Sequence, residues 1–118
     1  MYASLKSVAS QYFESFRKKD LESLYNLFDE QITLYDPIVS LVKGRDNVIN
    51  VNKKIFDDCN EIKFTKKDIF IDSTKMCAIA EIEFYCDKTK INVVDIITYS
   101  EDLKIKSITA YLDTKGLL

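Results

Sequence analysis

The sequence contains no histidine, and this absence excludes several kinds of chemistry. Without an imidazole, the chain cannot form a Ser-His-Asp triad, a Cys-His nucleophile pair or a zinc site that uses histidine. Glycine is almost as scarce, since only Gly44 and Gly116 occur among 118 residues. Glycine-rich phosphate loops need several glycines at fixed spacing, so they are excluded too. Any catalysis would have to use carboxylates, Tyr, Lys, Ser, Thr or Cys.

Long basic stretches and long apolar stretches are also missing. The chain has 17 basic and 19 acidic residues, and its longest basic cluster is Lys66-Lys67, which Asp68 follows directly. A nucleic-acid-binding surface would need a basic excess or a basic stripe. No apolar run approaches the 18 residues of a membrane span, and the first residues lack the apolar segment of a signal peptide. We therefore expect no nucleic-acid partner, no membrane partner and a cytoplasmic location.

The three cysteines do not suggest a site. Cys59, Cys77 and Cys86 make an odd number and include no Cys-x-x-Cys pair. This spacing favours neither a zinc knuckle nor a disulfide framework. We expect them to be small, partly apolar side chains in a reducing compartment, and we expect no metal and no cofactor.

The first half of the chain has mostly helical spacing. No linker or repeat interrupts the sequence, so residues 1–118 are predicted to form one domain. A first helix is predicted from the stripe Leu5, Val8, Ala9, Tyr12, Phe13 and Phe16. Asp20 is the predicted N-cap of a short second helix that buries Leu21, Leu24, Tyr25 and Phe28. Two short strands, 31–36 and 39–43, precede a third helix that carries Val48, Ile49, Asn52, Ile55 and Phe56 on one side.

The second half alternates between apolar and polar residues. Four strands are predicted at 61–71, 75–86, 90–100 and 103–113, with short polar turns between them. The predicted class is therefore α+β, with three N-terminal helices packed in the concave face of a curved, mainly antiparallel sheet. Because such a sheet twists and curls, we expect an apolar pocket at one end, between sheet and helices.

Several short motifs resemble the SnoaL-like, or NTF2-like, superfamily, which also includes ketosteroid isomerase. In the first half these motifs are Tyr12, Lys19-Asp20-Leu21, Leu27-Phe28, Tyr35-Asp36-Pro37 and Gly44-Arg45-Asp46-Asn47-Val48. In the second half they are Val94-Asp95-Ile96-Ile97-Thr98-Tyr99, Lys104-Ile105 and Tyr111-Leu112-Asp113. The resemblance covers nearly the whole chain. It implies a cystatin-like cone with an apolar pocket, and a homodimer that forms through the outer face of the sheet.

Three residues coincide with the catalytic set of the isomerase. The resemblance implies that Asp36 moves the proton, while Tyr12 and a protonated Asp95 donate hydrogen bonds to the substrate oxygen. It implies no cofactor. The partner would be a small apolar or carbonyl-containing ligand, and the enzyme would be an isomerase or a cyclase that transfers a proton next to a carbonyl.

The residues support these roles and also allow plainer ones. Asp95 is in phase with Val93 and Ile97, so its carboxyl should be buried and protonated, and hence able to donate a hydrogen bond. Asp36 lies at a strand end, where solvent and substrate can reach it. However, Asp-Pro is also a common turn starter, and Tyr12 is equally compatible with a core aromatic. Asp95 would face solvent if the strand phase slipped by one residue, or could be buried without a catalytic role.

This chain also departs from the isomerase pattern. Asn52 occupies the position of a further Tyr on the third helix, Asp102-Leu103-Lys104 lacks the glycine common in that turn, and the histidine of many relatives is missing. A non-catalytic module that binds a ligand or associates with a protein is therefore the alternative function. In either case the predicted pocket is lined by Phe16, Leu34, Asn52, Phe56, Val93, Ile97, Tyr99 and Tyr111.

Overall fold

The computed structural model describes residues 2–113 and contains three helices and six strands. The helices are α1 (Tyr2–Arg17), α2 (Leu21–Leu27) and α3 (Arg45–Asp58). The strands are β1 (Phe28–Asp36), β2 (Ser40–Lys43), β3 (Ile62–Asp72), β4 (Cys77–Cys86), β5 (Thr89–Tyr99) and β6 (Ile105–Leu112). None of the helices within residues 2–113 is long and apolar enough to cross a membrane.

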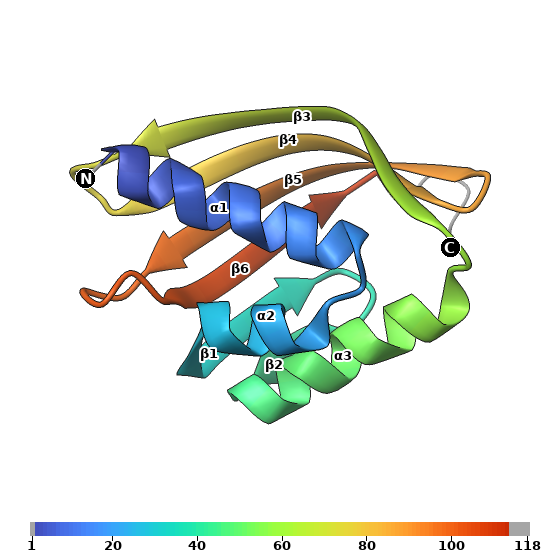
Figure 1. The fold of residues 1–118 in the computed structure, drawn as a ribbon, viewed down its shortest axis with the longest axis horizontal. Coiled ribbons are helices and arrows are strands. Elements are labelled where there is room, and N and C mark those ends of the chain that lie inside the picture. Colours follow the sequence, from blue (N-terminus) through green and yellow to red (C-terminus); the bar gives the residue numbers. More distant parts are fainter. Residues whose placement is uncertain (1, 114–118) are drawn as a thin grey trace.

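The six strands form one curved, open sheet in the order β2-β1-β6-β5-β4-β3. Every neighbouring pair is antiparallel except β1 and β6, which are parallel. All three helices lie on the concave face: α1 packs on β3 and β4, whereas α3 packs on β1 and β2 (Figure 1). The predicted fold class is therefore confirmed, and all three helices precede strands β3 to β6 in the chain.

The second helix begins where predicted but ends earlier. Asp20 caps it by accepting hydrogen bonds from the backbone N–H of Ser23 at 3.0 Å and from the Ser23 hydroxyl at 2.7 Å. The prediction that Phe28 belongs to this helix is wrong, because its extended backbone begins β1 while its ring is still buried. The prediction that Tyr25 is buried is also wrong. Its ring lies at the surface beneath the guanidinium of Arg45, 3.9 Å from Cζ.

The core lies between the concave face and the helices. Its fully buried side chains come from both layers, among them Leu5, Leu24, Phe28, Ile32, Ile97 and Ile105. Burying each side chain of this size contributes about 1.5–3 kcal/mol, so the interlayer contact is the main source of stability. One polar contact also fixes α1 on the sheet: the Tyr99 hydroxyl donates to the carbonyl of Leu5 at 2.9 Å.

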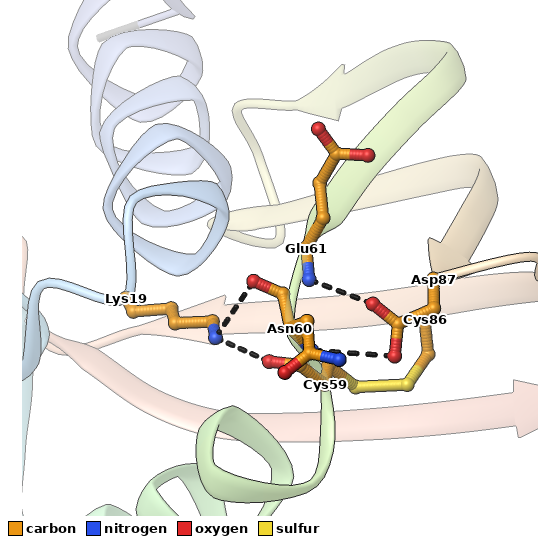
Figure 2. The surroundings of a disulfide bond; sticks show 6 residues. All are labelled: Lys19, Cys59, Asn60, Glu61, Cys86 and Asp87. Carbon is orange, nitrogen blue, oxygen red and sulfur yellow. Dashed lines mark hydrogen bonds between the residues drawn. A yellow bond between two sulfur atoms is a disulfide. The ribbon is translucent and has the colours of Figure 1, made fainter.

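Two cysteines form a disulfide, which corrects the prediction that all three are incidental thiols. Cys59 follows α3 and Cys86 ends β4. Their sulfur atoms are bonded to each other, and their Cα atoms are 5.2 Å apart (Figure 2). They are separated by 27 residues in sequence. Only the folded topology brings them together, so their spacing could not reveal the pair. Cys77 is the free cysteine of the described chain.

Polar contacts surround this disulfide on both sides (Figure 2). The Lys19 ammonium, from the α1–α2 connection, donates to the carbonyls of Cys59 and Asn60. The Asp87 carboxylate, from the β4–β5 turn, accepts from the backbone N–H groups of Asn60 at 3.2 Å and Glu61 at 2.8 Å. We call the six residues drawn in Figure 2 the disulfide corner. It joins three connections that are distant in sequence.

Candidate functional site on the concave face

Two of the predicted acid–base residues lie in one row across the concave face. Asp95 pairs with Ala80 on β4 and with Ala110 on β6. Tyr35 pairs with Thr109 in the parallel β1–β6 ladder, so the next residues, Asp36 and Ala110, are level with each other. Side chains that are level on neighbouring strands point to the same face. Asp36 and Asp95 thus share the concave face, with one strand between them and about 10 Å between their backbones.

The carboxyl group of Asp95 is enclosed by small side chains. The residue is only 7% exposed, and both of its cross-strand neighbours are alanines, which are themselves buried. Among residues 2–113, no hydrogen bond involves its carboxyl oxygens. Burial, together with the nearby charge of Asp36, raises the pKa of Asp95 to about 7. A large fraction of Asp95 is therefore protonated at neutral pH and can act as a donor.

Tyr12 projects from α1 toward the same row. Its side chain is 7% exposed, and its ring lies 6.1 Å from the ring of Phe16 and 6.2 Å from that of Phe28. Burial raises the pKa of Tyr12 well above its ordinary value, and the charges of Asp95 and Asp36 add to this effect. The hydroxyl is therefore a proton donor at any physiological pH. None of the hydrogen bonds within the described chain uses it.

The two carboxylate oxygens of Asp36 differ in their hydrogen bonds. Its Oδ1 accepts from the backbone N–H groups of Ile38 at 2.7 Å and Val39 at 2.8 Å, which closes the turn after Pro37. The interpretation of Asp-Pro as a turn starter is thus correct. Oδ2 takes part in no hydrogen bond within residues 2–113, and the side chain is only partly buried. One carboxylate can therefore close the turn and still accept a proton on its other oxygen.

An aromatic cluster lies directly beside Tyr12. The ring of Phe16 is 4.9 Å from that of Phe56 on α3, 6.3 Å from Phe64 on β3 and 6.0 Å from Phe84 on β4. Phe16 and Phe56 were predicted to line a pocket, whereas Phe64 and Phe84 were not. The alternation of apolar and polar residues along the two predicted strands could have indicated that Phe64 and Phe84 point inward. The β-bulge between Phe64 and Lys66 interrupts this alternation on β3.

The other predicted pocket residues divide between the two faces. Leu34, Val93 and Ile97 lie on the concave face, in the rows next to Asp36 and Asp95. Tyr99 is also buried, but four residues along β5 place it about 13 Å from Asp95. The prediction that Tyr111 lines this interior is wrong. Because Ala110 points inward, Tyr111 points outward, where it is 57% exposed.

Asn52 is the remaining predicted residue, and it is a buried amide without a partner. It lies on the buried stripe of α3 between Val48 and Phe56 and is 4% exposed. Its Nδ2 is fully buried, and the side chain makes no hydrogen bond within residues 2–113. We call Tyr12, Asp36, Asp95 and Asn52 the inner polar groups.

Two shallow hollows lie elsewhere on the molecule. One, of about 370 Å³, is lined by Glu81, Glu83, Asn92 and Tyr111 among others, and the second, of about 480 Å³, lies between α1 and β3. Neither contains the inner polar groups, so an interior pocket stays a prediction. Within the described residues, no group of three His, Cys, Asp or Glu side chains could hold a metal ion.

Known proteins share this architecture. The sequence matches the family profile of the SnoaL-like domain over residues 9–108. A proposed polyketide cyclase from Xanthomonas campestris pv. campestris has a TM-score of 0.86 at 11% identity, covering 98% of this chain and 95% of that chain. An NTF2-like protein of unknown function from Cytophaga hutchinsonii ATCC 33406 has a TM-score of 0.81 at 12% identity, covering 96% and 93%. A steroid delta-isomerase from Pseudomonas aeruginosa has a TM-score of 0.72 at 13% identity, covering 93% and 80%. No curated protein matches the sequence, and identities this low indicate a common fold alone.

Proposed function

Because this chain belongs to the SnoaL-like family, we propose that its concave face binds a small apolar ligand with a carbonyl group and transfers a proton next to that carbonyl. The observation that carries this proposal is the shared row of Asp36 and Asp95, with Tyr12 above it. Similar folds include a steroid delta-isomerase and proposed polyketide cyclases. The reaction would need no cofactor.

In this mechanism Asp36 is the base. Its Oδ2 accepts the proton from the carbon next to the carbonyl, and the electrons of the broken C–H bond form the C=C bond of an enolate. The negative charge then moves to the former carbonyl oxygen. The Tyr12 hydroxyl and the protonated Asp95 donate hydrogen bonds to that oxygen. If the ligand also has a C=C bond beyond the carbon that loses the proton, the enolate is conjugated with that bond. Protonated Asp36 then returns the proton to the far end of the C=C bond, the C=O bond re-forms and the C=C bond shifts toward the carbonyl, which completes an isomerisation.

The electrostatics of the site favour this division of roles. The charge of Asp36 raises the pKa of both Tyr12 and Asp95, so it keeps the two donors protonated. When Asp36 becomes neutral, an equal negative charge appears on the ligand oxygen beside those donors. The total charge of the buried site is therefore unchanged during the step, which avoids a large desolvation cost.

Binding of an enolate mimic tests this proposal. We expect phenol or naphthol to bind about tenfold more tightly to Asp36→Asn than to the unmodified protein, because a neutral amide does not repel the phenolate. Asp95→Leu and Tyr12→Phe should each weaken binding, since each removes a donor. Asp102→Asn is a matched control, because Asp102 is an exposed carboxylate in the turn between β5 and β6. Absence of binding by every variant, measured by titration calorimetry, would contradict an oxyanion-binding site.

A second candidate function is association through the outer face of the sheet. An outward-facing row crosses all six strands through the paired residues Leu41, Tyr35, Thr109, Ile96, Ile79 and Phe70. Four of its apolar members are at least 40% exposed, with Phe70 reaching 59%. Contiguous exposed apolar rows of this kind favour a protein interface. We propose that a second copy of this chain covers it, because the flanking Lys66, Asp68 and Glu81 carry both signs of charge and suit a self-complementary contact.

The oligomeric state tests this candidate independently. We expect the protein to sediment as a dimer, and Phe70→Asp to shift it to a monomer because the substitution places a charge at the most exposed residue of the apolar row. Lys54→Glu, on the exposed side of α3, should leave the dimer intact. A monomeric unmodified protein at micromolar concentration would contradict the interface without affecting the binding proposal.

A further inference from the structure

Asn52 is an unusual residue for its position on α3. Its neighbours on the buried stripe are Val48 and Phe56, and its own amide is 96% buried without a partner among residues 2–113. By contrast, Asn47 on the same helix is exposed, and its Nδ2 donates to the carbonyl of Lys43 at 2.9 Å. A buried amide without a hydrogen bond destabilises the folded protein. An apolar side chain would be the more stable choice at residue 52.

The geometry of α3 places Asn52 at the level of Asp36. The backbone N–H of Gly44 donates to the carbonyl of Ile32 at 2.8 Å, so α3 begins beside the middle of β1. The helix packs on β1 and runs in the same general direction (Figure 1). Eight residues of helix, from Gly44 to Asn52, span about 12 Å. Four residues of strand, from Ile32 to Asp36, span about 13 Å. Asn52 is thus beside the Asp36 end of the row.

The amide is also connected to the Tyr12 side of the interior. Phe56, one turn after Asn52 on the same stripe, contacts the ring of Phe16, and Phe16 contacts the ring of Tyr12. Asn52 and the other inner polar groups therefore face one interior, bounded by α1, α3 and the concave face.

The chemistry of a carbonyl oxygen indicates what the amide would bind. Such an oxygen has two lone pairs, and in the proposed complex Tyr12 and Asp95 already occupy both. Before the proton moves, a third donor would find no lone pair there. The Asn52 amide thus needs a different oxygen as its partner.

On the basis of the proposed function, we propose that Asn52 binds a second oxygen of the ligand. The ligand class would then be carbonyl compounds that also carry a hydroxyl or a second carbonyl group. Asn52 is a specificity residue in this proposal, since it takes no proton and contacts the part of the ligand that does not react.

A ligand comparison tests the specificity. We would measure the affinities of phenol and of its three dihydroxy analogues, catechol, resorcinol and hydroquinone, which place the second oxygen at three distances. For the unmodified protein we expect at least one dihydroxy compound to bind about fivefold more tightly than phenol, as one additional hydrogen bond would give. In Asn52→Leu this ratio should fall to about one, whereas phenol affinity should change less than twofold. Asn47→Leu is the matched control and should keep the original ratio.

Thermal unfolding without ligand provides a second, independent measurement. Since Asn52→Leu loses no hydrogen bond and adds apolar contact, we expect its Tm to rise by about 4 °C. A lower Tm than that of the unmodified protein would show that the amide has a structural role, and would overturn the proposal. Asn52→Ala, a smaller side chain, gives the affinity ratio if the leucine variant does not fold.

The outcomes separate this inference from the proposed function. If phenol binding depends on Tyr12 and Asp95 but no dihydroxy compound is preferred, the role of Asn52 is wrong and the proposed function stands. If none of the four compounds binds, both are wrong. A preference that disappears in Asn52→Leu and persists in Asn47→Leu supports the role of Asn52.

Discussion

The polar atoms of the disulfide corner form hydrogen bonds, whereas those of three inner polar groups, Tyr12, Asp95 and Asn52, form none within the described chain. At the corner, the ammonium of Lys19 and both oxygens of Asp87 bond to backbone groups. In the interior, the Tyr12 hydroxyl, the Asp95 carboxyl and the Asn52 amide make no hydrogen bond within residues 2–113. Groups of the first kind hold elements together. Groups of the second kind lower the stability of the fold, which is typical of residues kept for binding or catalysis.

The position of each group along its element explains this difference. Lys19 and Asp87 lie in connections, near backbone N–H and C=O groups that helices and strands leave without partners. Tyr12, Asn52 and Asp95 lie in the middle of α1, α3 and β5, where the backbone is already paired. A polar side chain in such a place has only another side chain, solvent or a ligand as partner.

Asp95 should make the free energy of unfolding depend strongly on pH. Its pKa is about 7 in the folded protein and near the ordinary 3.8 in the unfolded chain, so the folded state binds its proton more tightly. Stability due to this group is therefore complete below pH 4 and is lost as the pH rises through 7. We expect the stability of the unmodified protein relative to Asp95→Asn to fall by about 4 kcal/mol between pH 4 and pH 8. Urea denaturation of both proteins at several pH values measures this difference.

A second variant serves as a control for the cause of this shift. Because the charge of Asp36 contributes to the raised pKa of Asp95, Asp36→Asn should lower that pKa and reduce the pH dependence. If the unmodified protein and Asp95→Asn had parallel pH profiles, Asp95 would not be a buried titrating group.

Breaking the disulfide should have the next largest effect. The bond closes a loop across 27 residues, and in the chain-entropy account such a loop stabilises the folded state by about 3.5 kcal/mol. We expect the double substitution Cys59→Ser and Cys86→Ser to lower the free energy of unfolding by this amount in denaturant titrations. Cys77→Ser, which changes the free cysteine, should leave it nearly unchanged. Equal stability of the double variant and the unmodified protein would show that the bond does not form in solution.

The smallest expected effect concerns a single hydrogen bond at the corner. Asp87→Asn replaces one acceptor oxygen by an NH₂ group that faces a backbone N–H, so we expect a loss of about 1 kcal/mol. Asp72→Asn is the matched control, because Asp72 accepts from Thr74 and Lys75 within its own turn. Its loss should be smaller, since Asp87 connects segments 26 residues apart. If Asp87→Asn instead raised the free energy of unfolding, the hydrogen bonds of Asp87 would not stabilise the disulfide corner.

Local features of the fold could be predicted from the sequence. Asp20 is an N-cap whose partner lies three residues ahead, and the inward phase of Asp95 follows from alternation along one strand. Such features depend on neighbouring residues only. The spacing of the stripe on α1 likewise places Leu5, Ala9 and Tyr12 in the core.

Features that depend on distant pairing could not be derived from local patterns. The Cys59–Cys86 bond and the parallel β1–β6 ladder join segments with no shared motif. The level alignment of Asp36 with Asp95 follows from that ladder, so alternation alone could not establish it. A shift of one residue along a strand reverses the face to which a side chain points. Tyr111 is an example, because it follows the inward-facing Ala110 and is itself exposed.

The place of β6 in the sheet has a consequence for the order of folding. This strand is the last element along the described chain, yet it lies between β1 and β5 and is the only link between the strands of Asp36 and Asp95. During synthesis, β1 must wait for about 70 later residues before its long-range ladder can form. Nascent chains that lack β6 would therefore hold the two carboxyl groups on separate, unjoined segments. The site can assemble only in the final stage of folding.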